Sequence, residues 1–155
     1  MQRGAAVVIE TWYLDQHYTD IQPIFKECGI SYLKDWERGT KYNFLDYAIY
    51  WLQPEHPFFQ PPQAPVSLAN PNYLYWVPPL TSDAGDLLQL DSGGDAVLLA
   101  GTQPYQTSTY GVLATCKQGT VIVQTFSSHD YKESEVVAMW KNYMRYTLEN
   151  HFRGE

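Results

Sequence analysis

The sequence predicts an α+β fold, in which N-terminal helices and one long C-terminal helix pack on an antiparallel sheet of about five strands. Three observations favour this class. Apolar residues recur at helical spacing before residue 54, short β-type runs with glycine turns follow residue 79, and an amphipathic segment ends the sequence. We expect a single domain over residues 1–155, with a helical part (about 1–53), a proline and aromatic segment (54–79), a β meander (about 80–127) and a C-terminal helix (about 131–153).

The helical part is expected to contain three helical stretches. The first begins near Thr11, and Asp20 is a plausible N-cap for the second, which Gly29 can end. The third is capped by Thr40 and ended by Pro54, because apolar residues between them repeat at three and four positions.

Residues 5–9 leave two architectures open. This apolar run is too short for periodicity to separate a strand from the start of a helix. As a strand, it gives the element order of helix-grip domains, where a sheet wraps a long C-terminal helix around a cavity. Otherwise, a profilin-like or similar small α+β sandwich fits equally well.

Short apolar runs predict the strands of the sheet. Residues 73–77 are expected to form one strand between prolines, and residues 87–90 and 96–100 a hairpin around a glycine-rich turn. The run 96–100 is apolar at every position, so we expect it in mid-sheet with both faces covered. Residues 110–116 and 120–126 predict a second antiparallel hairpin.

The C-terminal helix has the clearest pattern. Asp130 and Glu133 have the spacing of a capping box, which predicts the helix start. One apolar stripe is expected to pack on the sheet, and the opposite face, which includes Asn142, is expected to be polar. The stripe consists of Val136, Val137, Trp140, Tyr143, Met144, Thr147, Leu148 and Phe152.

Composition favours a protein that binds another protein. Charged residues make up 17% of the sequence and aromatic residues 15%, whereas charged residues account for about 25% of average globular chains. Tyrosine and tryptophan are enriched at interfaces, because a large apolar body carries one polar tip. Eight of the ten prolines fall within residues 54–79, interleaved with aromatic side chains. The expected binding residues are Trp36, Phe58, Phe59, Tyr73, Tyr75 and Trp76.

Two other interpretations stay open. The aromatic residues of segment 54–79 can instead tie that loop onto an aromatic core. Alternatively, the protein binds a small apolar ligand in a cavity between the sheet and the C-terminal helix, reached by Trp140 and Tyr143. The direction of the aromatic side chains, outward or into one internal pocket, separates these interpretations.

No motif fixes a reaction. The four histidines have no metal-type spacing, so we expect no metal site and no cofactor. His56 and His129 are the remaining acid–base candidates, and Cys28 lies beside Glu27, which disfavours a thiolate. We therefore assign no catalytic residue and expect a binding protein rather than an enzyme.

Charge and cysteine content limit the partners and the compartment. A net charge of −7 disfavours nucleic acid, and no window approaches the ~20 apolar residues of a membrane helix. The expected partner is another protein chain or a second copy of this one. Cys28 and Cys116 form no metal-type pair, so we expect free thiols in a cytoplasmic protein.

One stretch resembles a known family. Residues 75–79, 85–91 and 94–97 are similar to a stretch of SUKH-type immunity domains. Those are small acidic cytoplasmic proteins, some of which neutralise a partner toxin by binding it. The helix and proline pattern that such domains carry near their start is missing here. The resemblance implies an inhibitor or immunity-type binder, and adaptor or assembly subunit are the other binding roles that we expect.

Overall fold

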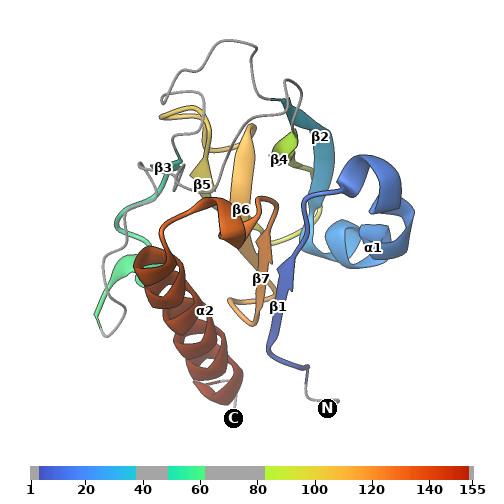
Figure 1. The fold of residues 1–155 in the computed structure, drawn as a ribbon. Helices are drawn as coiled ribbons and strands as arrows, with labels where there is room; N and C mark the ends of the chain where they lie inside the picture. Colours follow the sequence, from blue (N-terminus) through green and yellow to red (C-terminus); the bar gives the residue numbers. More distant parts are fainter. Residues whose placement is uncertain (1–3, 38–48, 62–82, 154–155) are drawn as a thin grey trace.

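The computed structural model describes residues 4–37, 49–61 and 83–153. These residues form one mixed sheet with two α-helices, α1 (Leu14–Cys28) and α2 (Glu133–Arg153), and two short 3-10 helices, η2 (Pro57–Phe59) and η4 (Ser128–Asp130) (Figure 1). The strands are β1 (Val7–Glu10), β2 (Ile30–Glu37), β3 (Tyr50–Trp51), β4 (Asp83–Leu90), β5 (Val97–Gly101), β6 (Gly111–Cys116) and β7 (Val121–Gln124).

The α+β class and the C-terminal helix are confirmed. Within the described ranges, however, the sheet is mixed and has seven strands rather than about five antiparallel ones. The main strand order is β1-β7-β6-β4-β2. β6 also pairs with β5, which lies off this path and pairs with β3 on its other side. β1 pairs in parallel with β7, from Val7 opposite Val121 to Glu10 opposite Gln124. Residues 7–10 are thus a strand, which is the condition of the helix-grip alternative, although the parallel pairing was not foreseen.

The helices cover opposite faces of the sheet (Figure 1). Successive residues of β7 show this most clearly. Ile122 belongs to the core cluster that contains the buried side chains of α2, whereas Val121 and Val123 belong to the cluster that contains those of α1. Side chains alternate across a strand, so β7 contributes to both cores. β6 is buried at all six positions for the same reason, and β5 is buried from Leu98 onward, as expected for mid-sheet strands.

The N-terminal helical part differs from the prediction. A single helix, α1, runs through Asp20 and Pro23, so Asp20 is not an N-cap. Gly29 does end the helix, with a left-handed φ of 78° and its N–H bonded to the Lys26 carbonyl. Residues 40–48 of the predicted third helix lie outside the described residues, and its end is a strand, since Tyr50 and Trp51 pair with β5.

The first predicted hairpin is wrong in its pairing. Among the described strands, β4 pairs with β2 and β6 rather than with β5. The connection from β4 to β5 is instead held against the end of α1, because Asp91 N–H donates to the Gly29 carbonyl (2.8 Å) and Ala96 N–H to the Cys28 carbonyl (3.1 Å). Gly94 permits this backbone contact, since a Cβ there would lie 2.0 Å from the Cys28 oxygen.

The second predicted hairpin is confirmed. β6 and β7 pair antiparallel from Leu113 opposite Gln124 to Cys116 opposite Val121. Lys117 and Gln118 both have positive φ in the turn, and the Asp95 carboxylate accepts both of their N–H groups, at 2.8 and 2.6 Å. A neighbouring loop thereby stabilises a turn conformation that non-glycine residues rarely adopt.

The two cysteines form a disulfide, which contradicts the expected free thiols. Cys28, at the end of α1, is bonded to Cys116, at the end of β6. The sequence did not reveal the pair because their separation of 88 positions carries no spacing signal.

The predicted capping box at α2 is also wrong. Asp130 ends the 3-10 helix η4, and α2 begins three residues later at Glu133. The N-cap of η4 is Ser127, whose hydroxyl oxygen accepts the His129 N–H at 3.2 Å. No helix among the described residues has the length and apolar character needed to cross a membrane.

Candidate functional site

The aromatic residues expected to bind a partner lie mostly inside the protein where the structure describes them. Trp36 on β2 and Phe58 in η2 are buried, at 7% and 1% exposure. Phe59 is half-buried and packs on Trp51, with ring centroids 5.0 Å apart. Trp36 and Phe58 therefore fit the tied-down aromatic core better than a binding surface. Tyr73, Tyr75, Trp76 and the expected strand at residues 73–77 lie outside the described residues.

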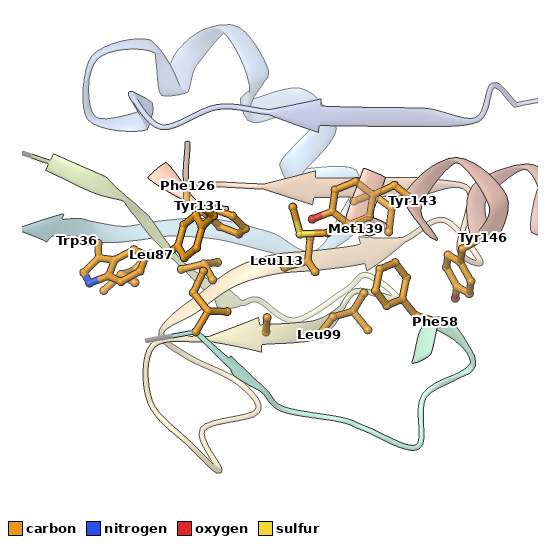
Figure 2. Close-up of a cluster of buried hydrophobic side chains, with 14 residues drawn as sticks. Trp36, Phe58, Leu87, Leu99, Leu113, Phe126, Tyr131, Met139, Tyr143 and Tyr146 are labelled. Atoms are coloured by element: carbon orange, nitrogen blue, oxygen red, sulfur yellow. The ribbon is translucent and has the colours of Figure 1, made fainter. Parts of the chain in front are cut away.

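The two residues of the alternative ligand pocket are held by other protein groups. Tyr143 is fully buried, contacts the rings of Phe58 and Trp140, and donates its hydroxyl hydrogen to Gln124 Oε1 at 2.7 Å. Figure 2 shows Tyr143 and Phe58 within the core cluster that lies between α2 and the strands. Trp140 is half-buried and donates its indole N–H to Ser128 Oγ at 3.1 Å.

Ser128 connects these side chains to the sheet edge. Its N–H and hydroxyl both donate to the Glu10 carboxylate, at 2.7 and 3.0 Å, and its oxygen accepts from Gln124 Nε2 at 2.9 Å. Burial and the nearby Glu10 charge raise the pKa of Tyr143 well above its usual value. Tyr143 is therefore neutral at physiological pH. The network joins β1, β7, η4 and α2 through neutral hydrogen bonds and through the two charge-assisted bonds from Ser128 to the Glu10 carboxylate.

An acidic cluster lies where α1, β2 and β4 meet. Asp15, Asp35 and Asp86 each bring a carboxylate oxygen within 4.8 Å of the others. Oxygen ligands of this type suit Ca²⁺ or Mg²⁺. Asp86 is buried and accepts the Leu14 N–H at 2.7 Å, so it also stabilises the first turn of α1.

Tyr32 borders this cluster and donates its hydroxyl hydrogen to Asp35. Burial, together with the three neighbouring carboxylates, raises the pKa of Tyr32. A pocket of about 580 Å³ opens beside Tyr32 and Asp35. Its other lining residues are Lys34, Trp36, Leu87, Thr102, Gln103 and Tyr110.

The outer face of α2 is the clearest surface feature. The expected apolar stripe is divided: Tyr143 and Thr147 face the core, whereas a second row points away from it. The exposed row follows one side of the helix at steps of seven, four and four residues. It consists of Val137 (45% exposed), Met144 (52%), Leu148 (40%) and Phe152 (60%).

We call this row, with Lys141 between its members, the outer face of α2. An open depression of about 600 Å³ lies beside its C-terminal half, lined by Arg145, Leu148, Glu149, Phe152 and Arg153. Asn142, predicted on the polar side, is buried instead at 4% exposure. The apolar residues in the sequence of α2 span more of the helix circumference than one packed face needs. The prediction of a single packed stripe did not take this width into account.

The two acid–base candidates lie at different 3-10 helices: His56 precedes η2, and His129 lies within η4. His56 Nδ1 accepts the Phe58 N–H at 3.2 Å and so caps η2, and burial lowers the pKa of His56. His129 is exposed in η4. His56 therefore has a structural role that its sequence context did not indicate.

Comparisons with protein-family models, with curated proteins and with solved structures find no match to this chain. The likeness to SUKH-type immunity domains accordingly stays an expectation from the sequence.

Proposed function

We propose that this protein works by binding another protein chain, and that the outer face of α2 is its contact surface. The observation that carries the proposal is the exposed row of Val137, Met144, Leu148 and Phe152 on a helix whose opposite face is already buried in the core. A helix with two opposed apolar faces has one face more than its own fold needs. Clusters of exposed apolar side chains often mark interaction sites on protein surfaces.

The proposal moves the binding surface from the sequence-predicted aromatic residues to α2. Burial removes Trp36 and Phe58 from contact with a partner, while Phe152 and Leu148 remain accessible. Helices that present apolar residues at steps of three and four dock into grooves or onto other helices. Inhibitor, adaptor and assembly subunit are all roles that such a surface can serve.

Site-specific photo-crosslinking tests the proposal. A photoreactive side chain at position 148 of the full chain should give covalent adducts in the cells that produce the protein. The matched control is position 24 on α1, because Ile24 is also an exposed aliphatic residue, at 43%. Adducts specific to position 148 support the proposal, whereas an equal pattern at both positions, or none, refutes it.

The compartment is a separate question. The expected cytoplasmic location depended on free thiols, and the Cys28–Cys116 bond is the observation that opposes it. Disulfides persist in oxidising compartments and are rare in the cytosol. Alkylation of the protein in freshly lysed cells, followed by mass measurement, decides this point: two alkyl groups support the cytoplasmic expectation, and none supports an oxidising compartment.

A further inference from the structure

We infer that the occupant of the outer face of α2 is α2 of a second copy of this chain, packed antiparallel. This inference rests on the proposed function and names the partner. Three features of α2 carry it: the symmetric spacing of its exposed apolar residues, the distribution of charge along the helix, and its neutrality within an acidic protein.

The spacing is self-complementary about the middle of the helix. Val137 lies seven residues before Met144, and Phe152 lies eight residues after it. When two such helices run antiparallel and cross near Met144, Val137 of each copy lies opposite Phe152 of the other. Both copies use the same patch, as a twofold symmetric interface requires.

Lys141 and Leu148 are related in the same way. Lys141 lies three residues before Met144, and Leu148 lies four residues after it. The alkyl stem of Lys141 can cover Leu148 of the second copy while its ammonium group reaches Glu149 next to that leucine. A lysine in the middle of an apolar face thus has a partner in the antiparallel arrangement.

The charges at the ends of α2 favour the same direction. Its first turn is acidic, with Glu133 and Glu135, and its last turn is basic, with His151 and Arg153. Antiparallel packing brings acidic and basic ends near each other and opposes the two helix dipoles. Parallel packing would place like charges together.

The neutrality of α2 limits like-charge repulsion when two copies approach through this helix. The helix contains three acidic residues (Glu133, Glu135, Glu149) and three basic ones (Lys141, Arg145, Arg153), so its formal charge is zero. The whole chain carries −7, so the negative charge resides on other segments. Two copies that approach through α2 therefore keep most of their like charge apart.

The contact is expected to be weak. A helix of 21 residues is about 31 Å long, and four partly exposed side chains give less area than the roughly 800 Å² per partner of a standard interface. We therefore expect a dimer with a dissociation constant in about the micromolar range, detected through its concentration dependence.

Sedimentation equilibrium over a hundredfold concentration range tests the inference. The wild-type mass should rise from 17.9 kDa toward twice that value. Leu148→Glu should raise the dissociation constant at least about tenfold. The matched control, Ile24→Glu, adds the same charge at a similarly exposed position on α1 and should dimerise as wild type. Because both side chains are exposed, circular dichroism should show both variants folded.

A charge exchange tests the antiparallel direction. Lys141→Glu places like charges near Glu149 of the second copy and should weaken the dimer, and adding Glu149→Lys should restore it. Failure of this rescue overturns the antiparallel arrangement.

A wild-type protein that stays monomeric overturns the choice of a second copy. The crosslinking experiment then separates the two proposals. Adducts at position 148 with a different chain leave the proposed function standing, adducts of two copies support both proposals, and the absence of position-specific adducts refutes the proposed function itself.

Discussion

Reduction of the Cys28–Cys116 disulfide should remove a large part of the stability of this protein. The bond closes a loop of 88 positions that includes β2 to β6. In the chain-entropy model, this crosslink lowers the entropy of the unfolded chain by about 15 cal/mol/K, which is about 4.6 kcal/mol at 25 °C. Since domains of this kind unfold with about 5 to 15 kcal/mol, the reduced protein should be only marginally folded.

Reduced wild-type protein is the cleanest comparison. Cys28 and Cys116 are 0% and 1% exposed, so substitution by alanine would add a cavity to the loss of the crosslink. Reduction keeps both sulfur atoms in the core and removes only the bond. Equilibrium urea unfolding with and without reductant measures the difference, which at a slope of about 2 kcal/mol/M corresponds to a midpoint shift of about 2 M.

Two results would refute this reasoning. Alkylation of the denatured, unreduced protein at two thiols would show that the bond does not form. A loss of less than about 1 kcal/mol on reduction would show that the closed loop is already constrained in the unfolded state, or that the entropic model does not apply here.

Two further substitutions test the backbone contact at Gly94 and the cap at His56. Gly94→Ala should lower the free energy of unfolding by about 3 kcal/mol or more, because the added Cβ would lie 2.0 Å from the Cys28 oxygen. The control Gly93→Ala has open space around it but a φ of 107°, so it should lower that free energy by about 1 to 2 kcal/mol. Urea unfolding measures both losses. Because burial lowers the pKa of His56, the unfolded chain binds a proton at this residue more readily than the folded protein. Stability is therefore full above the unfolded pKa near 6.5 and decreases as the pH falls below it. His56→Asn keeps an acceptor for the Phe58 N–H without titrating, so its Tm should fall less than that of wild type between pH 7.5 and 5.5.

Each of these expectations has a contrary outcome. Equal losses for the two glycine substitutions would mean that the loop from β4 to β5 does not pack on the end of α1. A Tm that falls in parallel for wild type and His56→Asn would mean that other groups dominate the acid sensitivity.

Local patterns predicted the elements that local sequence determines. Residues 120–126 and the run 96–100 gave correct strands, and Gly29 gave the correct helix end. The prediction of a helix start at Asp20 was wrong, because aspartate is a common N-cap residue but here lies inside a continuous helix. The cap at the start of α1 comes instead from Asp86, 72 positions away, which no local pattern can reveal.

The candidate site was missed for a related reason. Periodicity placed the apolar residues of α2 on one side of a helix, but it cannot say how much of that width the sheet covers. Tyr143 and Met144 are neighbours in the sequence, yet one is fully buried and the other is 52% exposed. Conversely, Trp36 and Phe58 were expected at the surface from composition, which carries no information on direction.

The parallel pairing of β1 with β7 also determines when β1 can pair during synthesis of the chain. Val7 pairs with Val121, so β1 has no partner strand until 114 further residues have been synthesised. At a synthesis rate of about 5 to 20 residues per second, this interval lasts roughly 6 to 23 s. Throughout it, residues 7–9 form an apolar β-type segment without its native strand neighbour, and such segments are prone to pair with other chains. The exposure of this segment to pairing with other chains is therefore expected to be greatest before β7 has been made.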